Sequence, residues 1–454
     1  MLLNIFELAA KLTVVAPTPA EIESATQGLS ELKEVSRPHD FYTYCANWKL
    51  APWIYTQLKR LNLIRLLNAE VVAEFKADFE KISAQNTKRN ETAAIFLKAF
   101  KEEGIEVIVL KGNYLAHTAY HEVGYKRMND FDILIHKKDW SRIQDVYLRL
   151  GYIPLGFGWS GEKEDPASFS HVGMSFISSD FSCIIGSQWG LKSPTTAFTV
   201  NIQEAWETAI DFDFCGIPVK ALSPEYNLLH LILHMGVYKC GIRDCMDVYN
   251  LVRSQTIDQA LLLKIIRQSN AVEKAVFTFT LCNLCSPTFS NEFIARIGSK
   301  TRGFLATRLK RRLEAASATG DFQVSYNDYF QDIEKQVIYF NLFPKFHVKL
   351  VFYVKILRMI YWPKMKFALR LNDRNQAPTL VNTLVSRVKA PYFVFSLIAQ
   401  EIGWKFTILL FLKLFVDLLI SLKNYVVHTE SYFDYLNKKG IDPQAIQKAV
   451  INIQ

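Results

Sequence analysis

The sequence contains no uninterrupted apolar run of the roughly 20 residues that a membrane-spanning helix needs. Its most apolar region, residues 391–422, is interrupted by four charged residues: Glu401, Lys405, Lys413 and Asp417. A charge near the centre of a span costs about 2.5–3.5 kcal/mol. The pattern therefore favours amphipathic helices that pack on the body of the protein or lie on a surface, rather than a transmembrane helix.

Several catalytic and targeting signatures are missing as well. There is no Gly-x-Ser-x-Gly motif, no Walker A loop, no dinucleotide-binding fingerprint and no internal repeat. The N-terminal stretch MLLNIFELAAKL lacks the basic region and cleavage site of a signal peptide. The 7 cysteines are scattered rather than paired in a framework, which is typical of reduced thiols. We therefore expect a cytoplasmic protein, and the alternative is a location at the periphery of the inner membrane.

Composition indicates a folded chain of several domains. Charged residues make up 21% and hydrophobic residues 50% of the 454 positions, which excludes a disordered protein. Changes in pattern divide the chain into four parts. They are an N-terminal helical lobe at 1–103, a mixed α/β domain at 104–221, a helical domain at 222–344 and a basic amphipathic helical tail at 345–454.

Positive charge is concentrated in the tail. The formal net charge is +9, and Lys345–Leu371 contains basic residues and aromatics but no Asp or Glu. Such a stretch suits an anionic membrane surface or a nucleic-acid backbone, and it also suits the solvated face of an ordinary helix. We expect peripheral contact of residues 345–425 with an anionic membrane as one interpretation, and RNA binding as another.

Residues 104–221 alternate between strand and helix patterns. Ile105–Leu110 and Asp130–Ile135 read as buried strands, and residues 113–121 and 139–150 read as helices. Two hairpins are expected after them: His171–Ile177 with Ser182–Gln188, and Asp211–Phe214 with Ile217–Ala221. This order predicts an α/β (α+β) fold with a mixed sheet, flanked by N-terminal and C-terminal helical regions.

The strongest chemical signal is the pair Asp130 and Asp132 at the start of the second strand. Side chains alternate along a strand, so both carboxylates project from one face while Phe131 points the other way. Adjacent carboxylates repel each other unless a cation lies between them. Mg²⁺ (or Mn²⁺) takes one or two carboxylates and completes its shell with substrate phosphates. We therefore predict Asp130 and Asp132 as metal ligands and catalytic residues.

Residues around this pair suit a triphosphate. A turn at Gly112 would let backbone N–H groups approach phosphate oxygens, and a helix beginning at Asn113 would add its positive N-terminal dipole. Lys111 supplies a point charge, and Arg127 can clamp a phosphate with two hydrogen bonds. The substrate-binding candidates are therefore Lys111, Gly112, Asn113 and Arg127.

The segment LKGNYLAHTAYHEVGYKRMNDFDILI resembles the core of a bacterial nucleotidyltransferase-like family, whose pattern runs LKG, a helix with Tyr, then Arg, then DxDxLV. It is also similar to the toxin nucleotidyltransferases of abortive-infection systems. Residues 222–252 and the Trp-Pro at 362–363 extend the resemblance. The resemblance implies a polymerase-β-type fold and Mg²⁺-dependent transfer of a nucleoside monophosphate from a nucleoside triphosphate to a hydroxyl acceptor. That acceptor is a small molecule, a sugar, a protein or RNA.

One departure from the family pattern concerns a third carboxylate on a following strand. The family reads Asp or Glu, one residue, His, Trp, whereas this chain reads Gly186-Ser187-Gln188-Trp189. Asp211 and Asp213 form a second alternating pair that could substitute if their strand runs beside Asp130, and Asp180 is a more distant option. The alternative function is a catalytically degenerate nucleotide-binding or membrane-surface scaffold protein.

Two weaker signals lie in the following helices. His230 and His234 share a helix face, but no third ligand is evident, so core or capping histidines are favoured over a zinc site. Arg243 and Asp247 are one helical turn apart and could pair with each other in a structural role.

Overall fold

The computed structural model describes residues 4–34, 38–155, 171–192, 196, 198–235, 241–298, 303–322, 346–362, 379–402, 404–427 and 432–453. The chain divides into two compact units. The first consists of Met1–Pro154, Asp165–Ser193 and Phe198–Val324, and the second of Leu155–Glu164, Pro194–Ala197 and Ser325–Gln454. Every candidate site residue belongs to the first unit. The four-part division read from the sequence stays a prediction.

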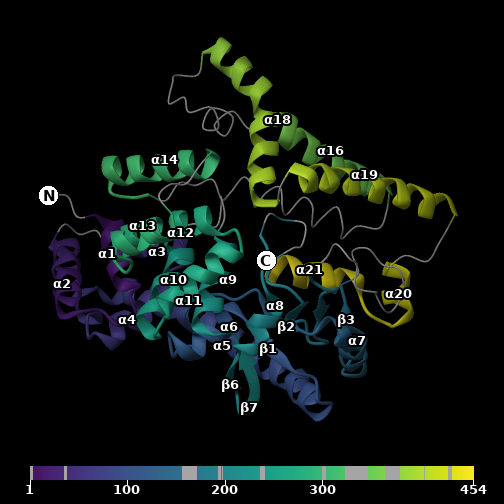
Figure 1. Cartoon of the computed structure of the whole chain (residues 1–454), viewed down its shortest axis with the longest axis horizontal. Helices are drawn as coiled ribbons and strands as arrows, with labels where there is room; N and C mark the ends of the chain where they lie inside the picture. The colour runs from purple at the N-terminus through teal and green to yellow at the C-terminus, as the bar shows by residue number, and fades with distance from the viewer. Residues whose placement is uncertain are drawn as a thin grey trace. The chain divides into compact units, whose positions relative to one another are not determined.

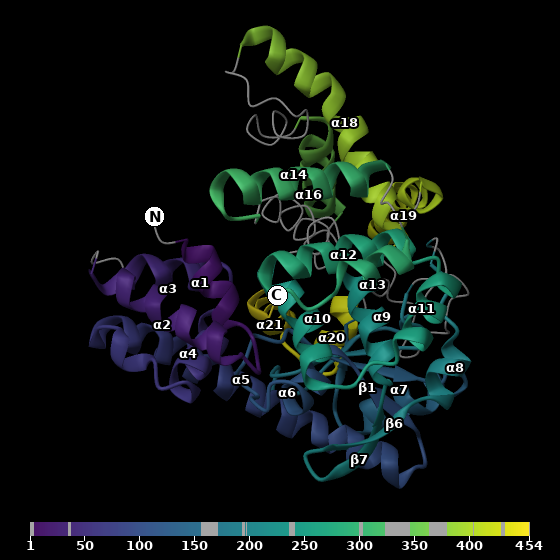
Figure 2. The same cartoon turned by 60° about the vertical axis from the view of Figure 1, so that its left-hand side comes forward.

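The N-terminal part of the first unit is helical, as predicted. Its helices are α1 (Ile5–Leu12), α2 (Pro19–Glu34), α3 (Pro38–Asn47), α4 (Ala51–Arg60) and α5 (Ala69–Glu102). Asn68 begins α5 by accepting a hydrogen bond from the Val71 amide, and Gly104 ends it with a φ of +66°. Helices α1 to α4 lie side by side in both views (Figures 1 and 2). The long α5 continues from this group to the sheet.

A mixed sheet forms the centre of the first unit. In the described part of the chain it has 7 strands in the order β3-β4-β5-β2-β1-β7-β6. The strands are β1 (Val107–Val109), β2 (Asp130–Ile135), β3 (Ile153–Pro154), β4 (Phe176–Ile177), β5 (Ile184–Gln188), β6 (Ile210–Phe214) and β7 (Ile217–Ala221). The central strand β2 pairs antiparallel with β1 and parallel with β5. Both predicted hairpins are confirmed, and so is the mixed α/β fold.

The two faces of the sheet have different partners. Phe131 and Ile133 of β2 are fully buried in a core built with α5 and with α7 (Trp140–Arg149). Leu134, one residue further on, belongs to the other core, which includes the C-terminal helices of the unit. The alternation along β2 therefore places Asp130 and Asp132 on the face that these C-terminal helices cover.

Most of the remaining helices of the first unit pack against one another and are grouped together in Figure 2. Including the two that flank the sheet, they are α6 (Lys111–Thr118), α8 (Ile202–Glu207), α9 (Pro224–His234), α10 (Ile242–Ser254), α11 (Gln259–Gln268), α12 (Val272–Cys285), α13 (Asn291–Ile297) and α14 (Gly303–Thr319). Ser223 caps α9 and Pro224 occupies its first turn, as predicted. Helices α9 and α10 both contact α6, which leads directly out of β1.

The second unit is helical in its described residues. Its helices are α16 (Phe346–Tyr361), α18 (Leu380–Ile402), α19 (Trp404–Val427), α20 (Tyr432–Lys438) and α21 (Pro443–Ile453). Helices α16, α18 and α19 contact one another, and α20 contacts α21. None of the helices in the described part of the chain combines the length and apolar character of a membrane span. Residues 363–371 of the basic stretch, and Pro363 of the Trp-Pro motif, lie outside the described residues.

Candidate nucleotidyltransferase site

Two carboxylates of β2 form the centre of the candidate site. Asp130 is the first residue of the strand and is exposed, whereas Asp132 is 7% exposed. Phe131 between them is fully buried on the opposite face. The shared face expected from strand alternation is therefore present. One carboxylate is open to solvent and the other is held inside the protein.

Lys111 lies against the buried carboxylate. Its Nζ donates to Asp132 Oδ2 at 2.6 Å. Burial lowers the pKa of the Lys111 ammonium, but the charges of Asp132 and Asp130 raise it by more, so the pKa lies above its ordinary value. Lys111 remains a cation at the carboxylate pair. The pair thus already holds one positive charge.

The backbone at Lys111 is in the left-handed region, with a φ of +55°. A residue with a Cβ in that region costs on the order of 1–3 kcal/mol, and such strain gathers at functional sites. The chain turns at this residue, and α6 begins there. The helix therefore starts two residues before the predicted start at Asn113. The turn directs the Lys111 side chain back toward β2.

Gly112 and Asn113 occupy the first turn of α6. A Cβ on Gly112 would lie 3.1 Å from the Tyr125 hydroxyl oxygen and 3.2 Å from the Met128 sulfur. Close packing against the segment before β2 therefore accounts for the glycine. Asn113 is 3% exposed, and its Oδ1 has no hydrogen-bond partner among the described residues. Asn113 Oδ1 is therefore a buried acceptor without a partner among the described residues.

Helix α10 positions the segment that carries Arg127. Asp247 is 5% exposed, accepts a hydrogen bond from the Tyr120 hydroxyl at 2.9 Å and forms an ion pair with Lys126. Arg243 donates to the backbone oxygen of Arg127 at 3.0 Å. The pairing of Arg243 with Asp247 that the helical spacing suggested is therefore wrong. Each residue instead bonds to the segment before β2, because that segment packs on α10.

Helix α5 supports the same segment from another element. Asn86 Nδ2 donates to two backbone oxygens of the stretch 123–126, at 2.7 and 2.8 Å, and Asn86 Oδ1 accepts a hydrogen bond from Arg89 at 2.7 Å. Arg89 is 4% exposed and its charge acts on Asp130 and Arg127. Burial lowers the pKa of Arg89, while the Asp130 carboxylate raises it. A buried guanidinium therefore lies close to the carboxylate pair.

Sequence reasoning missed Arg89. A signal for it was present in the helical periodicity of the sequence. Asn86, Arg89 and Asn90 lie on the same helix stripe as the buried apolar residues Phe75 and Phe96. Polar residues on the buried stripe of an amphipathic helix need partners inside the protein. The segment before β2 supplies these partners for Asn86, and Asn86 in turn accepts a hydrogen bond from Arg89.

The position of the third carboxylate is occupied by Gly186. In the parallel pair of β2 and β5, Gly186 is the direct partner of Asp132. A Cβ on Gly186 would lie 2.5 Å from Asp132 Oδ1. The Asp132 carboxylate thus lies over the glycine, and no side chain fits there while it stays in place.

The three candidate substitutes do not fill this position. Asp211 and Asp213 are on β6, which is three strands away from β2 in the sheet order and so roughly 14 Å away. Their strand therefore does not run beside Asp130, as a substitution would require. Asp180 instead accepts hydrogen bonds from Ser178 and Ser182 within its own turn, and these bonds outweigh desolvation and lower its pKa to about 2. Across the described residues there is no group of three His, Cys, Asp or Glu side chains arranged to hold a metal ion.

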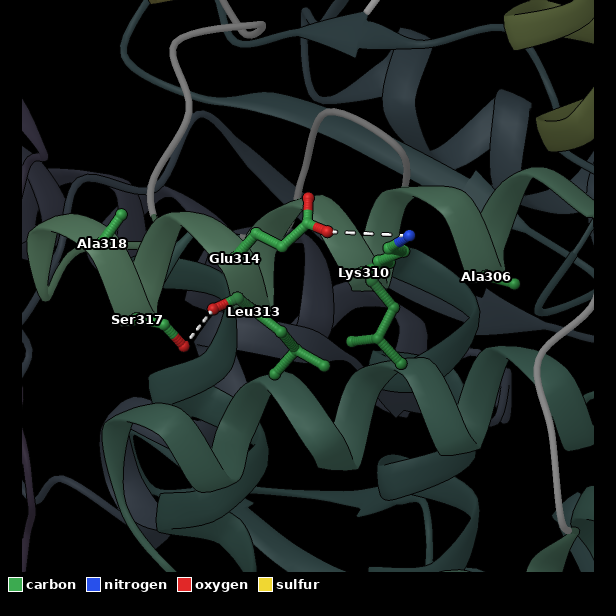
Figure 3. Close-up of a pocket in the computed structure, with 7 residues that line it drawn as sticks. Ala306, Lys310, Leu313, Glu314, Ser317 and Ala318 are labelled. Carbon is green, nitrogen blue, oxygen red and sulfur yellow. Dashed lines mark hydrogen bonds and ion pairs between the residues drawn. The ribbon is translucent and has the colours of Figure 1, made fainter.

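A hollow of about 610 Å³ lies elsewhere in the first unit, along α14 (Figure 3). Its lining residues all come from this one helix, along which Lys310 and Glu314 pair at 3.7 Å. It contains none of the predicted site residues. We therefore place the candidate site at β2 and α6 rather than at this hollow.

A comparison with protein families places the chain among known proteins. Residues 35–287 match the model of a family described as uncharacterised nucleotidyltransferase, and this range contains the whole candidate site. A search of curated proteins gives no match to the chain. The matched range covers more than half of the chain and includes the sheet, the carboxylate pair and the helices that face it. The chain therefore belongs to this nucleotidyltransferase family, with nucleotidyl transfer from a nucleoside triphosphate as its general activity.

Proposed function

We propose that the protein transfers a nucleoside monophosphate from a nucleoside triphosphate to a hydroxyl acceptor with the help of Mg²⁺ or Mn²⁺. In this reaction the acceptor hydroxyl gives its proton to water, its oxygen bonds to the α-phosphorus, the bond from the α-phosphorus to the bridging oxygen breaks, and pyrophosphate leaves. The observation that carries the proposal is the carboxylate pair Asp130 and Asp132 on one sheet face, beside Lys111 at 2.6 Å.

The donor set fits a hard divalent cation. Asp130 and Asp132 offer carboxylate oxygens, and the presence of the Lys111 ammonium on Asp132 supports a site arranged for positive charge. Mg²⁺ needs only one or two protein carboxylates when phosphates and water complete its shell. Bound there, the ion would neutralise charge that develops on the phosphates and activate the acceptor hydroxyl. Asp130 and Asp132 would be its protein ligands.

The neighbouring residues would bind the triphosphate. Lys111 can exchange its contact with Asp132 for a phosphate oxygen once a metal ion occupies the carboxylates, because its ammonium already lies at the carboxylate pair. Arg127 would provide a second cation, on a segment that α5 and α10 hold in position. Gly112 and Asn113 lie at the helix N-terminus, where backbone N–H groups favour an anion.

A second candidate is a nucleotide-binding protein that has lost catalysis. Gly186 favours it, because the residue beside Asp132 supplies no carboxylate to bind a second metal ion or accept a proton. Two carboxylates are still sufficient to bind a metal–nucleotide complex. The two candidates share the same site and differ only in turnover.

A peripheral membrane contact is compatible with either candidate. In the second unit, apolar side chains on α18 and α19 are exposed, among them Leu380 at 80%, Val388 at 80% and Ile408 at 56%. Exposed apolar residues on helices with a basic character suit the interface of an anionic bilayer. Flotation of the full chain with phosphatidylglycerol vesicles, but not with phosphatidylcholine vesicles, is the expected result. Equal recovery with both would contradict the charge-dependent contact.

The transfer reaction is tested by incubating the full chain with each α-labelled nucleoside triphosphate, a cell lysate and Mg²⁺ or Mn²⁺. The test variant is Asp130→Asn/Asp132→Asn. A matched control exists within the chain, because Asp211-Phe212-Asp213 repeats the same tripeptide on the edge strand β6. We expect label transfer from the wild type and from Asp211→Asn/Asp213→Asn, and none from the test variant. Nucleotide binding without transfer in the wild type would favour the binding module, and equal transfer by all three proteins would remove the site assignment.

A further inference from the structure

Helix α9 places a histidine without a partner inside the first unit. His230 is 1% exposed, and its Nε2 has no hydrogen-bond partner among the described residues. A buried polar atom without a partner costs about 1–3 kcal/mol, and such atoms in native proteins call for a specific explanation. No metal site accounts for it: the ring centre of His234 lies 5.0 Å away on the same helix, but the described residues hold no group of three His, Cys, Asp or Glu side chains arranged to bind a metal ion.

A second buried nitrogen without a partner lies on the sheet. Gln188 is 5% exposed, and its Nε2 has no hydrogen-bond partner in the described ranges. Gln188 pairs with Leu134 across β5 and β2, and it follows Gly186 by two residues. Its side chain therefore projects from the same sheet face as Asp132. An amide nitrogen can only donate, so it requires an acceptor atom.

His171 connects these two positions. The backbone oxygen of His171 accepts a hydrogen bond from the Trp189 amide at 2.8 Å, and Val172 bridges to Gln188. This brings His171 to the end of β5, directly beside Gln188. Lys192, four residues after the end of β5, donates to the backbone oxygen of Leu233 in α9 at 3.1 Å, and His171 contributes to the lowered pKa of His230 on the same helix. The end of β5 and the last turn of α9 therefore lie close together.

Positive charge surrounds this place. Lys192 and Lys274 both donate to the backbone oxygen of Leu233, at 3.1 and 2.9 Å, in the last turn of α9. Burial lowers the pKa of His230, and the charges of Lys111 and Lys192 lower it further, so the imidazole is neutral. The surroundings thus combine cations with neutral polar nitrogens. An anion with several acceptor oxygens matches this combination.

We propose that His230, Gln188 and Lys192 form a subsite for the β- and γ-phosphates of the nucleoside triphosphate, and so for the pyrophosphate that leaves. The inference rests on the proposed transfer reaction, and it assigns the polyphosphate end of the substrate to α9 and the end of β5. Phosphate oxygens would accept from Gln188 Nε2 and Lys192 Nζ, and the Nε2–H tautomer of His230 would donate to a third oxygen. Lys111 would lie between this subsite and the carboxylate pair.

The test measures binding by isothermal titration calorimetry on the full chain with Mg²⁺ present. Three probes are titrated: inorganic pyrophosphate, the four ribonucleoside triphosphates with a methylene bridge between the α- and β-phosphates, and the matching monophosphates. The variants are His230→Leu, Gln188→Leu and Lys192→Met. Lys220→Met serves as the charge-matched control, because Lys220 pairs with exposed Asp211 on the far edge of the sheet. Thermal melting confirms that each variant is folded, and Gln188→Leu leaves the Leu233 contact of Lys192 intact.

We expect each subsite variant to bind pyrophosphate at least tenfold more weakly than the wild type. The same increase in Kd is expected for whichever bridged triphosphate the wild type binds. The Kd for the monophosphate should stay within twofold, and Lys220→Met should match the wild type throughout. Folded variants that bind pyrophosphate within twofold of the wild type would overturn the subsite. The transfer proposal survives the loss of the subsite if the wild type binds the triphosphate and Asp132→Asn does not. A wild type that binds neither triphosphate nor pyrophosphate would overturn both.

Discussion

Replacing Gly186 by Ala tests whether the Asp132 carboxylate lies over the glycine. The new Cβ would stand 2.5 Å from Asp132 Oδ1, a separation that real Cβ atoms do not adopt. The carboxylate must therefore move, and moving it breaks the 2.6 Å contact with Lys111. Gly186 does not have a positive φ, so the substitution adds no backbone strain of its own.

The size of the effect follows from these contacts. A hydrogen bond to a charged group contributes about 1.5–3 kcal/mol, and overpacking costs about 1–3 kcal/mol. The carboxylate escapes the clash by giving up the bond, so the two costs do not add. We expect Gly186→Ala to lower the free energy of unfolding by about 1.5–3 kcal/mol. In an Asp132→Ala background the same change should instead stabilise the strand, by about 0.5–1 kcal/mol.

The assay is urea denaturation of the four proteins in this double-mutant cycle, followed by circular dichroism. The expected coupling energy between positions 132 and 186 exceeds about 1.5 kcal/mol, which is typical of residues in direct contact. An equal cost of Gly186→Ala in both backgrounds would refute the geometry. It would also reopen the position beside Asp132 to a side chain.

Two further predictions concern the structure around the site. Asp247→Asn should lower the free energy of unfolding by about 3–5 kcal/mol because it leaves Lys126, whose side chain is 15% exposed, without its counter-ion. Asp211→Asn in the exposed pair with Lys220 should cost much less. Urea titration compares the two variants, and similar costs would contradict the difference in burial between the two pairs. Stability should also fall as the pH drops from about 6.5 toward 4. Burial and the charges of Lys192 and Lys111 lower the folded-state pKa of His171 to about 4, and burial also lowers the pKa of His230, so the unfolded chain takes up these protons first. His171→Gln should flatten this decline in denaturation curves at pH 7 and pH 5, and an unchanged slope would show that another group causes it.

Much of the fold could be predicted because it depends on local patterns. The two-residue alternation in Asp130–Ile135 and the apolar run before Lys111 gave the two central strands, and Ser223-Pro224 gave the start of α9. The pairing of Asp132 with Lys111 was not predicted, because it depends on the left-handed turn of a residue other than glycine. Such a turn follows from the packing around it and leaves no mark in the local sequence.

The site shows the same division. The chain carries two Asp-Phe-Asp tripeptides, and their immediate sequences give both the same alternating geometry. The strand order separates them, because β2 lies in the middle of the sheet beside β5 whereas β6 lies at its edge.

The sequence by itself determined the carboxylate pair and the family, since these are written in adjacent residues. Only the tertiary structure decided that Gly186 lies opposite Asp132, and that Arg89 and His230 approach the same sheet from α5 and α9. Strand register and the meeting of distant helices depend on long-range packing, in which each residue's place is set by partners far away in the chain.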